Sequence, residues 1–289
     1  MSLPNSGLSD TVPGIGRHSE DPKSETMNDK INGIPSVLAC DVGNCAVHFA
    51  HVHGDDVTEV QTIPVGQLHG LGAAMAELWQ GIPEPRTVVA TSVNPSALKA
   101  LEAAANECLD QAVFVVGRDL PLPMSTDLPN PQSIGTDRLC AAVAAYDRLG
   151  TACVVADFGT AITIDCVNGE GVFLGGAILP GLNMAADALH EKTAQLPRVE
   201  MRAATWVFGR DTSETIISGI LATAHGALRD LVEAYATELG KWPTVIVTGG
   251  DAELVCGQAG DGELVQAIVD DLTIRGTALA YYNSLIEKR

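Results

Sequence analysis

Short apolar runs alternate with longer helical patterns along most of this chain of 289 residues. In the first half, three apolar or alternating stretches between residues 37 and 63 predict strands, and a helix follows over residues 67–80. A buried strand over residues 87–93, a helix over 95–109 and a strand over 112–116 complete this half. Strands that alternate with helices predict an α/β sheet whose faces are covered by helices.

The second half repeats this alternation. A strong helical pattern covers residues 135–150. Three strand-like stretches follow it, at residues 152–156, 161–167 and 172–178. After these we expect a helix over residues 183–196 and a long helix over 212–239. A strand over 244–248 follows, then a helix from Ala252 and a last helix over 275–288. The Pro-rich stretch 120–133 predicts an ordered loop between the halves. Residues 1–34 have neither a periodic apolar pattern nor the apolar core of a secretory signal, and predict a disordered extension.

A motif that recurs after 116 residues relates the two halves. An apolar run ends in DVGN at Asp41, and another ends in DFGT at Asp157. Each is followed by an alternating stretch, a Gly- and acid-rich turn and a third β-like run. A strand that ends in Asp-x-Gly places a carboxylate and backbone N–H groups at a hairpin mouth, which suits Mg²⁺ and phosphate oxygens. One such turn is common in ordinary hairpins, but two turns across a cleft would hold one nucleotide between two related domains.

The net charge excludes some classes of binding partner, and the cysteines indicate the cellular compartment. The net charge is −19, so the surface repels nucleic acid and anionic membranes, and we expect neither as a partner. No apolar run approaches the length of a membrane span. The seven cysteines show no CxxC spacing and lie mostly in apolar runs, which indicates buried free thiols in a reducing cytoplasm.

Further candidate groups stand at the ends of expected elements. Asp137 opens a helix, where it is either a cap or a carboxylate that accepts a hydroxyl proton during phosphate transfer, and Arg138 adds a fork for a carboxylate or phosphate. The Gly-rich stretch 174–181 predicts either a tight turn or a loop close to a ligand. Gly249 and Gly250 end a buried strand, where a base or phosphate can approach the next helix. His48, His51 and His53 have no accompanying Cys or Glu ligands, so we expect no metal there.

The motifs DVGN, GTDR, DFGTAITIDCV, LGGAILPG, TAQLP, GRDT and VTGG occur in this order along the chain. In this respect residues 37–287 resemble the type III pantothenate kinases, a family in the superfamily of acetate and sugar kinases, heat-shock chaperone ATPases and actin. The resemblance implies two duplicated actin-like (ribonuclease H-like) α/β domains, over residues 35–133 and 134–289, with an interdomain active-site cleft. It also implies phosphorylation of pantothenate by ATP to 4'-phosphopantothenate, the first step of coenzyme A biosynthesis. The expected enzyme is a cytoplasmic homodimer that uses Mg²⁺ and a monovalent cation, K⁺ or NH₄⁺.

The same resemblance assigns roles to residues. ATP contacts are expected from the first phosphate motif and its following strand, from a second-half hydroxyl and from the last glycine turn, that is, from Asp41, Val42, Gly43, Asn44, Cys45, Ala46, Val47, His48, Thr160, Gly249 and Gly250. Asp41 would hold Mg²⁺, directly or through water, and Asp157 the monovalent cation. Substrate contacts are expected from Gly135, Thr136, Asp137, Arg138 and Thr193, with Asp137 as the catalytic proton acceptor.

Two departures from the family pattern keep other interpretations open. Cys45 stands where the family usually has Thr or Ser, and a thiol is a poorer hydrogen-bond donor than a hydroxyl. Leu128 stands near the place where the family often has a Tyr close to pantothenate. One alternative is a catalytically impaired relative that acts as a nucleotide-binding or regulatory protein. Another is a kinase of the same superfamily that acts on a different small molecule.

Overall fold

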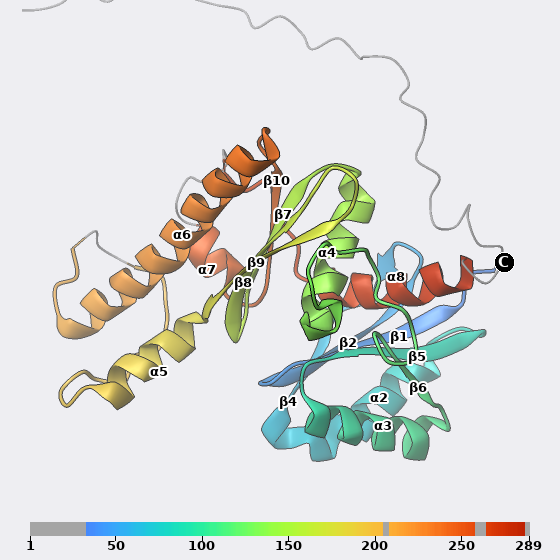
Figure 1. The fold of residues 1–289 in the computed structure, drawn as a ribbon. Coiled ribbons are helices and arrows are strands. Elements are labelled where there is room, and N and C mark those ends of the chain that lie inside the picture. Colours follow the sequence, from blue (N-terminus) through green and yellow to red (C-terminus); the bar gives the residue numbers. More distant parts are fainter. Residues whose placement is uncertain (1–32, 205–207, 258–263, 287–289) are drawn as a thin grey trace, which may run out of the picture.

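A computed structural model describes residues 33–204, 208–257 and 264–286, and in these residues two β-sheets are each covered by helices (Figure 1). The predicted extension lies outside the described residues except for its last two positions. Of these, Ile34 is buried against the first sheet.

The first sheet has the strand order β3-β2-β1-β5-β6, and β4 also pairs with β2. The strands are β1 (Ser36–Val42), β2 (Ala46–His53), β3 (Asp56–Val57), β4 (Gln61–Pro64), β5 (Arg86–Ser92) and β6 (Val113–Val115). Where the sequence predicted one strand over residues 57–63, the structure has the two short strands β3 and β4. Polar residues at 58 and 59 interrupt the strand there, and the Thr58 side chain accepts a hydrogen bond from the His51 backbone N–H at 3.1 Å.

The second sheet has the order β11-β10-β7-β8-β9. Its strands are β7 (Cys153–Phe158), β8 (Ala161–Val167), β9 (Phe173–Pro180), β10 (Thr244–Thr248) and β11 (Ala267–Ile268). In each sheet, the strand that carries the Asp-x-Gly motif lies between an antiparallel partner that follows it directly and a parallel partner from later in the same half. The strand order therefore repeats in the way that the sequence motif repeats.

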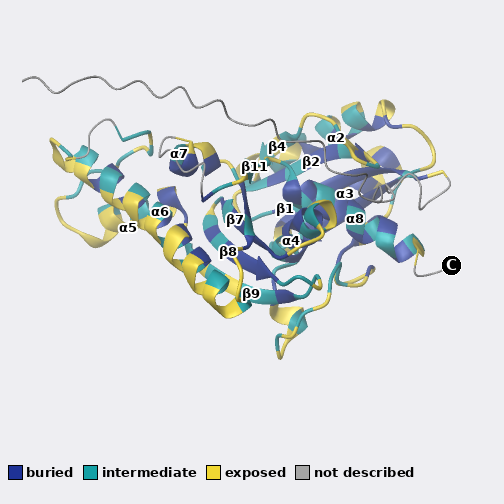
Figure 2. Cartoon of the chain, turned by 90° about the horizontal axis from the view of Figure 1, so that it is seen from above, coloured by how far each residue is buried: buried dark blue, intermediate teal, exposed yellow. Residues whose placement is uncertain are grey.

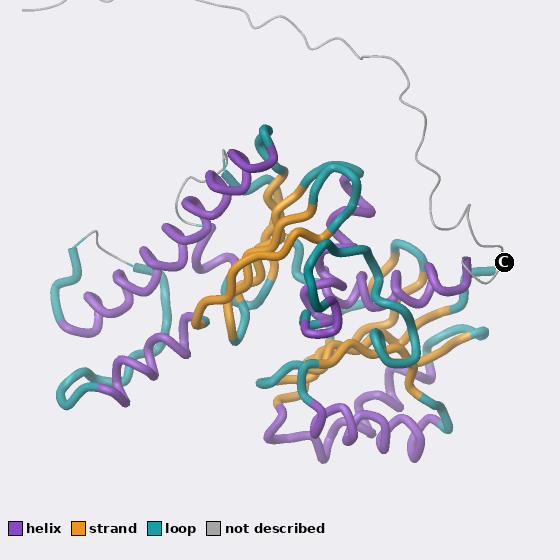
Figure 3. Tube along the Cα trace, in the orientation of Figure 1, coloured by secondary structure: helices purple, strands orange, loops and turns teal. Residues whose placement is uncertain are grey.

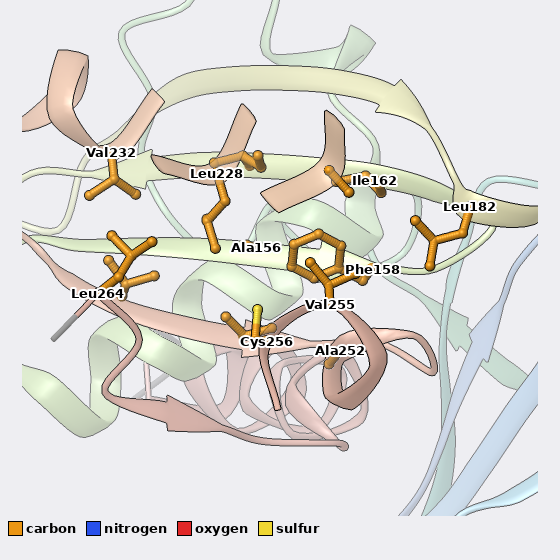
Figure 4. Close-up of a cluster of buried hydrophobic side chains, with 14 of the residues drawn as sticks. Ala156, Phe158, Ile162, Leu182, Leu228, Val232, Ala252, Val255, Cys256 and Leu264 are labelled. Carbon is orange, nitrogen blue, oxygen red and sulfur yellow. The ribbon is translucent and has the colours of Figure 1, made fainter. Parts of the chain in front are cut away.

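Helices cover the outer face of each sheet. One group of helices packs on the first sheet, namely α2 (Leu71–Gln80), which follows the 3-10 helix η1 (Val65–Gly70), and α3 (Pro95–Leu109). Another group packs on the second, namely α5 (Leu182–Lys192), α6 (Thr212–Leu239) and α7 (Ala252–Cys256). Figure 4 shows part of this second core, in which Phe158 and Ile162 contribute from β7 and β8 and Leu228 from α6. Figure 2 shows that the strands are mostly buried while α5 and α6 each expose one face. The α6 helix begins where the Asp211 side chain accepts a hydrogen bond from the Glu214 N–H at 2.9 Å.

Two helices lie between the sheets. The α4 helix (Thr136–Leu149) packs mainly on the second sheet, whereas α8 (Leu272–Ile286) returns from the end of the chain to cover the inner face of the first. They cross so closely that a Cβ at Gly276 would overlap the carbonyl oxygen of Cys140. The chain before α4 is mostly irregular, with one 3-10 turn, η2 (Pro131–Ser133), as Figure 3 shows. This arrangement brings the starts of α4 and α8 to the same edge as the two Asp-x-Gly turns.

Candidate active site

A cavity of about 360 Å³ is lined by residues of both Asp-x-Gly turns, together with the start of α4, the end of β10 and the start of α8. Asp41 and Asp157 occupy equivalent places in their sheets. Asp41 lies opposite Thr91 on the parallel strand β5, and Asp157 lies opposite Thr248 on the parallel strand β10. The repeated motif therefore delivers two carboxylates to one cavity.

Four carboxylates in this cavity, those of Asp41, Asp137, Asp157 and Asp165, are partly or fully buried and close enough to influence one another. The Oδ1 atom of Asp41 is buried and has no hydrogen-bond partner. Burial, followed by the charges of Asp137 and Asp157, raises the pKa of Asp41 to about 8. Burial, followed by the charges of Asp137 and Asp165, raises the pKa of Asp157 to about 7. The pKa of Asp137 is also raised, mainly by burial. Such perturbed carboxylates are typical of catalytic and ion-binding sites.

Asp137 lies in the second position of α4 and is not the N-cap residue of this helix. The residue at the N-cap position is Gly135. The Asp137 Oδ1 atom accepts a hydrogen bond from the backbone N–H of Arg138 at 2.8 Å, and a Cβ at position 135 would overlap the same oxygen. The loop thus leaves room for the carboxylate beside the helix, where it lines the cavity.

Arg138 forms a bidentate ion pair with Asp165 of β8. Its Nε donates to Oδ2 of Asp165 at 3.0 Å, and its Nη2 donates to Oδ1. Asp165 is not among the site residues predicted from the sequence. The signal was the alternation of β8, because Asp165 lies on the same strand face as Ala161 and Thr163, and all three line the cavity.

The other expected ATP-binding residues divide into two groups. Several line the cavity: Gly43, Asn44, Cys45, Ala46, His48, Thr160, Gly249 and Gly250. In contrast, the side chains of Val42 and Val47 are buried in the core of the first sheet, so only their backbone could meet a ligand.

The expected substrate-binding residues Gly135, Thr136 and Thr193 do not line this cavity. The Thr136 hydroxyl accepts a hydrogen bond from the Thr91 hydroxyl at 2.6 Å and joins α4 to β5. Thr193 lies at the end of α5, where its hydroxyl donates to the carbonyl oxygen of Leu189 at 2.8 Å.

A second cavity, of about 780 Å³, adjoins the first. Residues of both turns, including Cys45 and Thr160, line both cavities, and so does Gly250 after β10. Residues of α5, among them Asn183 and Lys192, also line the second cavity. The two turns therefore stand between an inner, acidic cavity and a larger outer one.

The inner cavity suits a cation that is bound by a protein carboxylate and by phosphate oxygens at the same time. No three Asp, Glu, His or Cys side chains among the described residues form a complete metal site. The buried, unpartnered oxygen of Asp41 is nevertheless a free ligand. Mg²⁺ in phosphate-transfer enzymes is typically held by one or two carboxylates together with phosphate oxygens and water, so the residues present fit that ion.

Comparison with known proteins identifies the family. The model of the family described as type III pantothenate kinase matches residues 37–234. A type III pantothenate kinase from Geobacter sulfurreducens is 31% identical over 252 residues, which cover 85% of this chain and 98% of that protein. One from Syntrophotalea carbinolica is 36% identical over 194 residues, covering 67% of this chain and 75% of that protein. The chain belongs to the type III pantothenate kinase family. The resemblance read from its motifs is confirmed.

Solved structures agree on the fold. A protein described as a Baf family transcriptional activator from Campylobacter jejuni has a TM-score of 0.55 at 21% identity, covering 85% of this chain and 98% of that one. Component A of the (R)-2-hydroxyglutaryl-CoA dehydratase of Acidaminococcus fermentans has a TM-score of 0.51 at 16% identity, covering 88% and 98%. At these identities only the fold is carried over. It is the predicted fold, with two actin-like α/β domains.

Proposed function

We propose that this chain is a kinase that transfers the γ-phosphoryl group of ATP to the 4'-hydroxyl of pantothenate and so begins coenzyme A biosynthesis. The observation that carries the proposal is the position of Asp137. In this member of the family, its partly buried carboxylate lines the same cavity as both Asp-x-Gly turns. In such a cavity a hydroxyl, a proton acceptor and a triphosphate are brought together, and phosphoryl transfer requires chiefly this alignment.

The residues of the inner cavity have separate parts in the transfer. Backbone N–H groups of the two turns bind the phosphate oxygens, and the nucleoside lies in the outer cavity. The 4'-oxygen forms a bond to the γ-phosphorus while the bond to the β–γ bridging oxygen breaks, and ADP leaves. The hydroxyl proton passes to the carboxylate of Asp137. Because burial raises the pKa of this carboxylate, it is a better proton acceptor than an exposed aspartate.

The proposed cations balance the charge of the cavity. Asp41 holds Mg²⁺, directly or through water, and Asp157 holds a monovalent cation, K⁺ or NH₄⁺. When bound, these ions neutralise negative charge on the phosphates and the carboxylates. Each of the two carboxylates would otherwise remain buried without a positive partner, which raises its pKa.

The active form is proposed to be a homodimer. A groove of about 1130 Å³ between α5 and α6 is lined largely by apolar side chains, including Leu189 and Ile216. Nearby, Ile178 on the edge strand β9 is 64% exposed. Thr193 follows Lys192, which lines this groove, and does not line the inner cavity of its own chain, so in this proposal Thr193 contacts the substrate of a second copy. Sedimentation equilibrium of the wild type and of Ile178→Asp tests this: the wild type should be dimeric and the variant weakened in association.

The other expected properties follow from charge and composition. A net charge of −19 disfavours binding to nucleic acid or to anionic membranes. None of the helices that the structure describes is long and apolar enough to cross a bilayer. All seven cysteines are free, which suits a reducing compartment such as the cytoplasm.

The decisive experiment is ADP release measured with ATP and Mg²⁺, with pantothenate and with a panel of other small hydroxyl compounds. We expect ADP formation that depends on pantothenate and increases with K⁺ or NH₄⁺. Equal ADP release with and without pantothenate would refute the kinase assignment. A faster reaction with another hydroxyl compound would indicate a different small-molecule kinase. Full activity with Na⁺ alone would contradict the cation role of Asp157.

A further inference from the structure

The inner cavity is lined by many more acidic than basic side chains. The described residues that line it include six aspartates but only one lysine or arginine, which is Arg138. Pantothenate carries a carboxylate as well as the hydroxyl that is phosphorylated. A cavity of this composition repels a second anion unless a fixed positive group receives it.

Arg138 is held in one orientation. Asp165 binds the Nε and Nη2 edge of the guanidinium, and the side chains of Arg138 and Asp165 are only 15% and 2% exposed. The guanidinium carbon also lies 5.6 Å from the centre of the Phe173 ring. Among the residues that the structure describes, no protein partner binds Nη1 of Arg138. The ion pair therefore occupies one edge of the guanidinium and leaves the Nη1 edge available.

The strands around Asp165 are shaped to hold its carboxylate. Gly176 of β9 lies directly opposite Asp165 in the register of the sheet. A Cβ at position 176 would overlap both Oδ1 of Asp165 and the carbonyl oxygen of Ile164. That same carbonyl accepts a hydrogen bond from the Tyr235 hydroxyl at 3.2 Å. The backbone of β9 thus lies close against the carboxylate that holds the guanidinium, and Tyr235 holds the strand that carries it.

We propose that Asp165 is a positioning residue, which holds Arg138 so that its Nη1 edge receives the carboxylate of the substrate. This inference rests on the proposed function and adds to it a positioning residue that does not itself touch the substrate. Two N–H groups of a guanidinium match the two oxygens of a carboxylate, and such charged hydrogen bonds are strong and directional. Without Asp165 the flexible arginine side chain would keep its charge but lose this orientation.

The test compares kcat/KM for pantothenate with kcat/KM for the corresponding alcohol, in which the carboxylate is reduced to a hydroxymethyl group. Wild-type enzyme should prefer the acid. Asp165→Asn should lower kcat/KM for pantothenate by about tenfold or more, chiefly through KM, because an oriented charged hydrogen bond is weakened. The kcat/KM for the alcohol and the KM for ATP should change little. An equal loss with the acid and the alcohol would mean that Asp165 is only structural and would overturn the proposal.

Two further variants keep the test decisive. The double replacement Asp165→Asn with Arg138→Gln removes both charges, so no buried ion is left unpaired if the single variant folds poorly. It should also abolish the preference for the acid. Asp270→Asn is a matched control, because it removes another cavity carboxylate that makes no bond to Arg138, and the preference should persist. If wild-type enzyme uses neither compound, both proposals fail. If it uses pantothenate and every variant keeps the preference for the acid, the roles of Asp165 and Arg138 in binding the carboxylate are refuted, whereas the proposed function is not.

Discussion

The hairpin β1–β2 and the hairpin β7–β8 carry the same aspartate at the same place in their sheets, yet their turns are built differently. Three residues, 43–45, connect the strands of the first hairpin, and the N–H of Gly43 donates to the carbonyl oxygen of Ala46 at 3.0 Å. Only two residues, 159 and 160, connect the strands of the second hairpin, where the N–H of Gly159 donates to the carbonyl oxygen of Ala161 at 3.2 Å. The additional residue of the first turn is Cys45, which is exposed to the cavity.

The surroundings of the two turns differ even more. Backbone packs directly against the second hairpin: a Cβ at Gly249 would overlap Oδ1 of Asp157, and a Cβ at Gly181 would overlap the carbonyl oxygen of Thr160. The first turn is supported from behind by a side chain, since Nδ2 of Asn94 donates to the carbonyl oxygen of Gly43 at 3.4 Å. The second hairpin therefore leaves no room for a side chain at Gly181 or Gly249. Within the described part of the chain, the first turn has no such backbone packed against it, and one of the two departures from the family pattern, Cys45, lies there.

The largest effect should come from Asp137, whose charge acts on the aspartates of both hairpins. Asp137→Asn should lower kcat by about 10²–10⁴-fold, the usual range for a positioned acid–base group. Its thermal unfolding should change little, because the side-chain oxygen of Asn can still accept the hydrogen bond that the Arg138 N–H donates to Asp137. Asp127→Asn, in the exposed loop before α4, is the matched control and should keep wild-type kcat. A fully active Asp137→Asn enzyme would exclude Asp137 as the proton acceptor.

The tight packing of the second hairpin is tested by Gly249→Ala and Gly250→Ala. Gly249 has φ of +95°, and a Cβ there would lie 2.6 Å from the backbone of Phe158, whereas a Cβ at Gly250 would meet nothing within 4 Å. We expect Gly249→Ala to lower the free energy of unfolding by about 1–3 kcal/mol and to weaken ATP binding. Gly250→Ala should stay within about 0.5 kcal/mol of wild type. Denaturant unfolding and the KM for ATP measure both. Equal effects of the two variants would contradict the close packing.

The buried aspartates of the two hairpins predict a pH dependence of stability in metal-free protein. In the folded state the pKa values of Asp41 and Asp157 are about 8 and about 7, against about 4 in the unfolded chain. The folded form therefore holds protons that the unfolded form releases. These two groups contribute stability at pH below about 4, and the contribution is lost as pH rises through about 7 to 8.

Thermal unfolding in a chelator at about pH 5.5 and about pH 8.5 checks this. The Tm should fall towards the higher pH, and Asp41→Asn should reduce the fall, whereas the exposed control Asp127→Asn should not. Mg²⁺ should restore part of the lost stability at the higher pH. If Asp41→Asn shows the full wild-type dependence, the protonation of Asp41 does not contribute to it.

Much of this fold could be predicted because local patterns carry it. Residues 212–239 were predicted as a helix from their periodicity, and α6 has these bounds. The strand predicted over 244–248 is likewise β10. The duplication could be predicted because the Asp-x-Gly motif is a local sequence feature that repeats. That α8 crosses back to the first sheet could not, because its apolar residues show only that the helix is buried and not which sheet covers it.

The candidate site was predictable to the extent that it lies in short motifs. Asp41, Asp137 and Asp157 were found because each stands in such a motif, and they line one cavity. Asp165 was missed because an aspartate within a strand pattern predicts a side chain that faces solvent. Its ion pair with Arg138, 27 positions earlier, is known only from the structure. The sequence also could not show that Val47 points into the core, since its neighbours in the same strand line the cavity.

The smallest expected effect concerns the more open first turn. Cys45→Thr restores the hydroxyl that the family usually has, at a position that lines both cavities. One neutral hydrogen bond to phosphate contributes about 0.5–1.5 kcal/mol, so the KM for ATP should fall several-fold at most and kcat should change little. Alkylation of the wild type gives a companion measurement: ATP with Mg²⁺ should slow modification of Cys45, with the buried Cys153 as an unreactive control. Unchanged reactivity would mean that Cys45 does not lie at the phosphates. A higher KM for ATP in Cys45→Thr would mean that this turn has adapted to the thiol, so that the more open hairpin is as specific in its packing as the closed one.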